Sequence, residues 1–241
     1  INSKMGRWGL ISACARAVNP GCQVDHTLCL VGPQGCGKST AVRILGGCGT
    51  ADDWYLGSLP DLRRADVGMG LAGSWIVEIG ELDAFRGVAS SRIKDFLTQC
   101  VDTYRAPYAR QFQTRPRTVV FCGTTNSTEF LSDETGGRRF FCVEVRGLHT
   151  GELVRDREQL FAEAYAAYKN GEQWPPEPTD VTKLKVIQEE HQIYDAWESE
   201  ISEYIKTRDW VSCEEVLRML GFEPRDYERR HQMRIGDIMT S

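Results

Sequence analysis

The sequence predicts an α/β domain with a central, largely parallel sheet, followed by a smaller and mainly helical region. Three observations lead to this fold class. Short apolar runs alternate with stretches of helical spacing through the first 150 residues. A glycine-rich loop directly follows the first of these runs. After residue 150 the strand-like runs stop and acidic helical segments replace them.

The first 150 residues supply the elements of the α/β domain in order. A helix is predicted from Gly6 to Val18, where Asn19-Pro20-Gly21 ends it. Apolar runs predict buried strands at 27–31, 74–78, 118–122 and 140–145. Helical spacing predicts helices at 39–45 and 90–100.

The remaining residues predict helices and one break. A helix is expected at 155–169, and the segment WPPEP at 174–178 reads as a linker because prolines cannot continue a helix. Further helices are expected at 180–206, after the capping box Ser212-x-x-Glu215, and from Arg225 onward. We therefore expect three parts: a core at 1–150, a helix with a proline-rich linker at 151–178, and a helical or winged-helix-like region at 179–241.

Composition narrows the class of protein. The chain has 241 residues, of which 41% are hydrophobic and 26% charged, which excludes a wholly disordered or fibrous protein. No apolar stretch approaches the ~18 residues of a membrane span, so we expect no membrane partner and a cytoplasmic location. Because the chain begins at Ile1 and ends inside a predicted helix, we expect a piece of a longer protein.

Cysteine and histidine usage gives no support for a zinc site. The nine cysteines are odd in number and show no C-x-x-C spacing, and the four histidines are scattered. Several cysteines lie inside strand-like runs, so we expect buried free thiols in a reducing compartment.

The most specific motif is GPQGCGKS at 32–39, which matches the phosphate-binding pattern G-x-x-x-x-G-K-[ST]. Glycines allow backbone N–H groups to face phosphate oxygens, and the following helix directs its positive end at the same anion. Lys38 should reach the β- and γ-phosphates, and the Ser39 hydroxyl should coordinate Mg²⁺. These features predict ATP and Mg²⁺ as ligands of a P-loop NTPase. The residues expected to hold the nucleotide are Gly32, Gly35, Cys36, Gly37, Lys38, Ser39 and Thr40.

Two acids and an amide are candidates for the chemistry. Glu78 lies at the predicted end of an apolar strand, where a carboxylate would bind Mg²⁺, and Glu81 could polarise the attacking water. The assignment between the two stays open, because the usual adjacent pair of acids is absent. Asn126 follows another apolar strand and could orient the water. Arg138 and Arg139 precede the last strand and could neutralise transition-state charge on a neighbour's nucleotide.

A basic segment lies inside an acidic protein. The net charge is −5, yet residues 86–117 hold seven basic and two acidic residues. Tyr104, Tyr108 and Phe112 alternate there with arginines, a mixture suited to single-stranded nucleic acid. The alternative is that some of these tyrosines are core residues and some arginines form structural ion pairs. The expected DNA contacts are Lys94, Arg105, Tyr108, Arg110, Arg115 and Arg117.

The order of these motifs resembles the virulence-associated protein E family. The resembling segments are LVGPQGCGKST, WIVEIGELDAF, IKDFLTQCVDTYRAPYARQFQTRPR, VFCGTTNSTEFLSDETGGRRF and LFAEAYAAYKNGE, which cover about half of the chain. The resemblance implies an AAA+ ATPase related to superfamily 3 helicases, with five parallel strands and ATP hydrolysis between the subunits of a ring. One departure is Phe141, where tryptophan would be expected.

The resemblance also assigns roles to residues. Lys38 and Ser39 take the Walker A roles, Glu78 and Glu81 belong to the Walker B region, and Asn126 is the sensor. Either Arg138 or Arg139 is the arginine finger, with Arg139 preferred. The basic segment corresponds to the DNA-contacting element.

The function expected from the sequence is an ATP-driven DNA helicase or translocase in phage or mobile-element replication. It would act on single-stranded or forked DNA as a homo-oligomeric ring, a hexamer by expectation, in the host cytoplasm, and a primase-polymerase module is a candidate partner. The first alternative is an AAA+ ATPase that does not unwind DNA, such as a loader or a switch. The second is a P-loop kinase for a small molecule, which would be monomeric.

Overall fold

The computed structural model describes most of the chain. The described residues are 1–47, 49–50, 53–62, 64, 66–81, 90–105, 109–127, 139–191, 197–208 and 210–240.

Within the described residues, five parallel strands form the central sheet, in the order β2-β3-β6-β1-β7. The strands are β1 Thr27–Val31, β2 Tyr55–Leu56, β3 Ile76–Gly80, β6 Val120–Thr125 and β7 Phe140–Glu144. Every pairing within this sheet is parallel. The structure thus confirms an α/β fold with a parallel sheet, and it adds the two-residue strand β2, which was not predicted.

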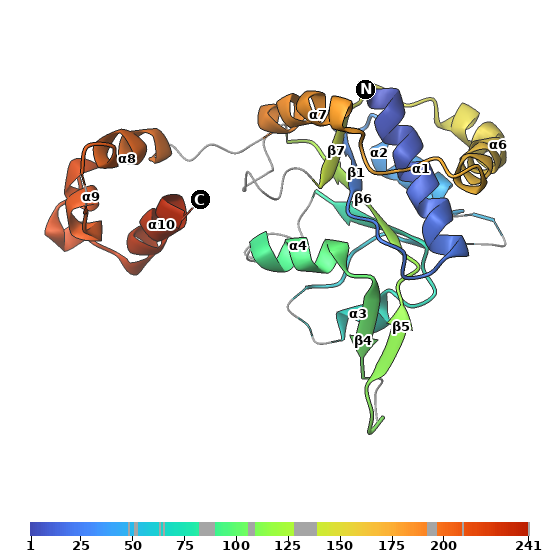
Figure 1. The fold of residues 1–241 in the computed structure, drawn as a ribbon, viewed down its shortest axis with the longest axis horizontal. Helices are drawn as coiled ribbons and strands as arrows, with labels where there is room; N and C mark the ends of the chain where they lie inside the picture. The colour runs from blue at the N-terminus through green and yellow to red at the C-terminus, as the bar shows by residue number, and fades with distance from the viewer. Residues whose placement is uncertain are drawn as a thin grey trace.

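Helices cover both faces of the sheet, as Figure 1 shows. The helices are α1 Asn2–Val18, α2 Lys38–Leu45, α3 Val67–Gly70, α4 Ser90–Thr98, α6 Thr150–Lys169 and α7 Pro178–Glu190. On one face, α1, α2 and α6 pack on apolar residues such as Ile76, Val120 and Cys122. On the other face, α3 and α4 cover the residues that alternate with these along the strands, such as Val77 and Phe121. This alternation is what a strand buried on both faces requires.

An antiparallel hairpin, β4 Val101–Tyr104 with β5 Gln113–Pro116, interrupts the α/β order between α4 and β6. In Figure 1 it projects from the body beside α3 and α4. Side chains of β4 alternate between exposed and buried, whereas all four residues of β5 are exposed. The hairpin therefore has one face against the body and one face toward solvent.

Two helices after residue 150 pack against the α/β domain. Helix α6 packs along α1 and α2, and Trp174 donates a hydrogen bond to the Gln23 carbonyl at 3.1 Å. Helix α7 packs on β7, where Gln188 donates to the Phe140 carbonyl at 3.0 Å. The helix and proline-rich linker expected at 151–178 thus lie against the α/β domain, where Phe161 and Trp174 pack on its apolar core.

The C-terminal helices have a small core of their own. These are α8 Glu198–Ile205, α9 Cys213–Met219, the 3-10 turn η2 Pro224–Asp226 and α10 Arg229–Thr240. Ile201, Val216, Leu217 and Ile235 form the fully buried centre of this unit. The predicted capping box is present, with Ser212 and Glu215 bonded reciprocally at the start of α9. Among the described helices, none combines the length and the apolar character that crossing a membrane would require.

Candidate nucleotide site and exposed hairpin

The glycine-rich loop lies at the carboxyl edge of the sheet, between β1 and α2. Gly35 and Gly37 have φ values of +82° and +93°, a region that side chains with a Cβ rarely adopt. Gly32 is required for a second reason, because a Cβ there would lie 2.0 Å from the Val145 carbonyl oxygen. The loop is therefore built close against the end of β7, and its shape depends on glycine.

Lys38 opens helix α2 and turns its ammonium back into the loop. Its Nζ donates to the carbonyl oxygens of Gly32 at 2.7 Å and Pro33 at 2.9 Å, and to Asn126 Oδ1 at 2.8 Å. The side chain is largely buried, whereas Ser39 and Thr40 are exposed on the first turn of α2. A lysine held at the centre of such a loop is placed to meet an anion.

Asn126 links the lysine to Glu81. Its backbone N–H donates to Glu81 Oε2 at 3.1 Å and its side-chain amide donates to Oε1 at 2.8 Å. The topology explains this meeting, because β6 lies between β1 and β3 and their carboxyl ends share one edge. Lys38, Asn126 and Glu81, which are far apart in the sequence, thus form one continuous polar chain.

Glu78 occupies a different environment. It lies inside β3, two residues before the strand ends, and only 2% of it is exposed. One carboxylate oxygen accepts a hydrogen bond from the Tyr55 hydroxyl, and the other accepts one from Thr124 Oγ1 at 2.7 Å. Burial, and then the charge of Glu78, raise the pKa of the neighbouring Cys122 thiol to about 12.

The expected ligands of ATP and Mg²⁺ can be tested against these contacts. Two left-handed glycines, a centred ammonium and a helix N-terminus fit a triphosphate. The described residues contain no cluster of three or more histidine, cysteine or acidic side chains that could hold a metal by themselves.

Arg139 lies at the opposite edge of the sheet. Its carbonyl oxygen accepts a hydrogen bond from the Thr27 N–H at 2.7 Å, so it sits where β1 begins and not where the glycine-rich loop follows β1. The five residues of β1 separate these positions by roughly 16 Å at 3.3 Å per residue. Arg138 lies outside the described residues.

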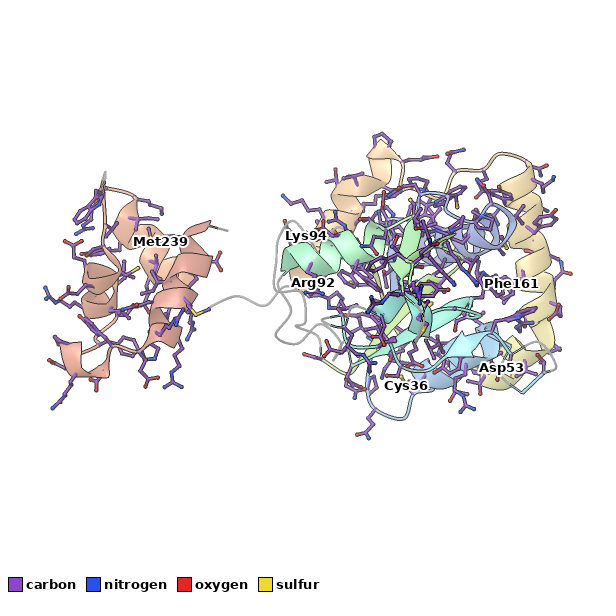
Figure 2. The ribbon with its side chains drawn as sticks, turned by 90° about the horizontal axis from the view of Figure 1, so that it is seen from below. Cys36, Asp53, Arg92, Lys94, Phe161 and Met239 are labelled. Atoms are coloured by element: carbon purple, nitrogen blue, oxygen red, sulfur yellow. The ribbon has the colours of Figure 1, made fainter. Side chains whose placement is uncertain are left out.

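The expected DNA contacts divide into exposed and buried groups. Arg105, Arg110 and Arg115 are exposed on the hairpin, together with Phe112, which is 69% exposed. Lys94 is half-buried on α4, where Figure 2 shows it near Arg92. Tyr108 lies outside the described residues.

The predicted contact of Arg117 with DNA is wrong. Its side chain is 0% exposed and forms an ion pair with Asp102, so it has no access to a DNA phosphate. Tyr104 is also buried, at 4% exposure. The charge count that marked this segment could not distinguish arginines facing solvent from one that holds the hairpin to the body.

Sequence reasoning also missed Tyr55 and Thr124, the two partners of Glu78. Tyr55 lies on a strand of two residues, too short to produce a periodic pattern, and Thr124 was read as part of a small polar run. No signal in the sequence marks either hydroxyl as a partner of a buried carboxylate.

Comparison with known proteins gives a family and structural neighbours. The family described as "Virulence-associated protein E-like domain" matches residues 1–193, which confirms the resemblance drawn from the motifs. Among curated proteins, none matches the sequence. An apo structure of the NrS-1 C-terminal region (305–718) matches 94% of this chain at 16% identity, with a TM-score of 0.50. An A-form apo structure of the same region matches 86% at 16% identity, with a TM-score of 0.45. The chain spans 57% and 48% of those two structures, respectively.

Proposed function

We propose an ATP-driven DNA motor as the function of this chain, which belongs to the virulence-associated protein E-like domain family. The observation that carries the proposal is the chain of contacts from Lys38 through Asn126 to Glu81 at the end of the glycine-rich loop. It brings together a phosphate-binding cation, an amide and a carboxylate, which are the groups that hydrolysis of a phosphoanhydride requires.

Each residue has a distinct role in this P-loop NTPase. Lys38 neutralises charge on the β- and γ-phosphates, and the loop N–H groups hold the remaining oxygens. Glu81 accepts a hydrogen bond from the attacking water, and Asn126 keeps that carboxylate and the water in position. Ser39 and Glu78 are the proposed Mg²⁺ residues, and the ion would supply further charge neutralisation.

A second copy of the chain would complete the site. Arg139 lies at the edge of the sheet opposite its own loop, and therefore cannot reach the phosphates bound there. In the proposed AAA+ ring, an arginine in this position would act on the nucleotide of a neighbouring subunit. Arg138 or Arg139 would then stabilise the charge that develops on the neighbour's γ-phosphate.

The hairpin is the proposed contact with DNA. Its exposed residues include Arg110, Phe112 and Arg115, which suit the phosphates and bases of a single strand. Family membership supports a role in phage or mobile-element DNA replication inside a bacterial host, with a primase-polymerase module as a candidate partner. Superfamily 3 helicase activity, in which the hairpin pulls on one strand, is the specific form proposed.

The test is the ATPase rate as a function of protein concentration, with and without single-stranded DNA. We expect a cooperative rise with concentration and stimulation by DNA. Lys38→Ala should abolish turnover with the fold intact, since it removes the ammonium from the loop. Lys185→Ala is the matched control, because Lys185 is a surface lysine with a side chain 75% exposed. Equal loss in both variants, or unchanged turnover in Lys38→Ala, contradicts the site.

Strand displacement on forked DNA separates the motor from a non-unwinding ATPase. Stimulation of hydrolysis together with displacement supports the helicase. Stimulation without displacement would identify a loader or a switch built on the same site.

A further inference from the structure

The buried guanidinium of Arg117 joins the hairpin to the body of the protein. Its Nε donates to both oxygens of Asp102, at 3.0 and 3.1 Å, and its Nη2 donates to Gln99 Oε1 at 2.9 Å. Its Nη1 donates to the carbonyl oxygen of Phe96. Asp102 belongs to β4, whereas Phe96 and Gln99 lie in and just after α4, so one side chain fixes the hairpin to the end of that helix.

Aromatic rings and a second arginine complete this cluster. The Arg117 guanidinium lies 4.6 Å from the ring centre of Phe96 and 5.5 Å from that of Phe121 on β6. Arg16, from α1, donates to the carbonyl oxygens of Arg117 at 3.4 Å and Gln99 at 3.2 Å. Elements from four parts of the chain therefore meet at the base of the hairpin.

The body also supports the inner strand of the hairpin. A Cβ at Gly68 of α3 would lie 3.1 Å from the Cβ of Asp102 and 3.4 Å from the ring of Tyr104. The outer strand, β5, has no buried residue. Arg115 on this outer strand is paired in register with Asp102. Directly paired residues lie on the same face of a hairpin, so Arg115 shares the face of Asp102, and it stays exposed because no residue of β5 is buried against the body.

Strand β6 connects this cluster to the nucleotide site. Arg117 lies three residues before β6, and Asn126 directly follows the strand. All six residues of β6 are buried, and the strand is paired with β1 on one side and β3 on the other. The segment from Arg117 to Asn126 spans roughly 30 Å in extended form. It therefore has the Arg117 cluster at one end and the Asn126 amide of the candidate nucleotide site at the other.

We propose that Arg117 and Asp102 form a positioning pair that couples the DNA-facing hairpin to the nucleotide site through β6. The inference rests on the proposed function and adds to it a residue pair that touches neither ligand. Because a buried, multiply bonded guanidinium holds its partners in one geometry, a shift of β6 would move the hairpin with it. Breaking the pair should leave both sites able to bind while removing the communication between them.

The experiment compares hydrolysis and DNA binding in two anchor variants. Asp102→Asn removes the counter-charge but keeps the shape, and Asp102→Asn/Arg117→Gln removes both charges so that no lone cation stays buried. For each, basal ATPase, affinity for single-stranded DNA by fluorescence anisotropy, and ATPase at saturating DNA are measured. Thermal melting identifies a variant that fails to fold, in which case the other variant decides.

We expect both variants to keep basal hydrolysis and DNA affinity near wild type and to lose stimulation by at least about tenfold. Arg115→Ala is the matched control: it should weaken DNA binding, and its stimulation should return at saturating DNA. Full stimulation in the anchor variants overturns the coupling role. Parallel loss of basal hydrolysis also overturns it, since the pair would then support the whole fold. A wild-type chain without ATPase activity refutes the proposed function itself, and the coupling role fails with it.

Discussion

Glu81 combines an unusual backbone with a specific contact. Its φ is +48°, the one positive value recorded for a non-glycine residue in the described part of the chain. This conformation costs on the order of 1 kcal/mol, and such strain tends to persist where a functional geometry requires it. Here the turn brings the carboxylate onto both N–H donors of Asn126. Under the proposed function, we therefore expect Glu81, and not Glu78, to be the acid that polarises the attacking water.

This preference predicts different defects for the two acids. Glu81→Gln should bind ATP and lose hydrolysis by about 10²-fold or more, because the amide cannot polarise water as a carboxylate does. Glu78→Gln should instead raise the Mg²⁺ concentration needed for half-maximal turnover. Glu144→Gln, an exposed glutamate at the end of β7, is the control. Equal shifts in Mg²⁺ requirement for the first two variants would contradict the distinction, and a shift in Glu81→Gln alone would reverse the assignment.

Cys36 lies within the glycine-rich loop, so alkylation of its thiol is expected to obstruct nucleotide binding. It is half-buried, and its Sγ lies 3.8 Å from Lys38 Nζ. Burial raises the pKa of Cys142 to about 12 and that of Cys14 to about 11, so these two thiols stay protonated and unreactive. We expect N-ethylmaleimide to abolish ATPase activity, ATP to protect, and Cys36→Ala to resist inactivation. Cys213→Ser, which removes an exposed thiol, should stay sensitive to the reagent. Resistance of this variant would show that inactivation occurs at Cys213 and not at Cys36.

At the level of elements, the glycine-rich loop could be predicted from the sequence and the hairpin could not. The loop at 32–39 could be predicted because its chemistry is local and its glycines are essential to its shape. The hairpin could not, because the segment QTRP of β5 has neither apolar alternation nor a buried residue. In β4, the alternation VDTY places Asp102 and Tyr104 inward, and an inward acid has meaning only beside Arg117. The role of Asp102 therefore depends on Arg117, a residue outside β4, and the pattern within β4 does not reveal it.

The solvent face of the hairpin predicts a salt-dependent contact with DNA. Arg110→Ala should weaken single-strand binding and reduce the slope of log K against log salt by about 0.7, the value for one phosphate contact on a single strand. Phe112→Ala should weaken binding with little change in slope, because stacking is uncharged. Anisotropy titrations at several salt concentrations measure both. Arg155→Ala, on the exposed surface of α6, is the control and should change neither quantity.

At the level of the whole molecule, the candidate nucleotide site and the proposed arginine finger lie at opposite edges of the sheet. The glycine-rich loop, Glu81 and Asn126 lie at the carboxyl edge. Arg139 and the base of the hairpin lie at the amino edge, where Gly21 N–H donates to the Arg117 carbonyl at 2.9 Å just before β1. Strand polarity could be expected from the α/β pattern, but the placement of Arg139 at the far edge required the register of β7 on β1.

This separation predicts complementation between two inactive proteins. The double variant Arg138→Ala/Arg139→Ala should bind ATP without hydrolysing it, because its loop is intact and its neighbour lacks the arginine. Lys38→Ala should lack turnover because its own loop cannot hold phosphate, yet it still presents both arginines. In mixtures, an intact loop of the first variant can face the arginines of the second, so part of the activity should return. The measurement is ATPase rate against mixing ratio at constant total protein, with each variant alone as the control. A flat, inactive profile in mixtures shown by light scattering to co-assemble would mean that these arginines do not act across subunits.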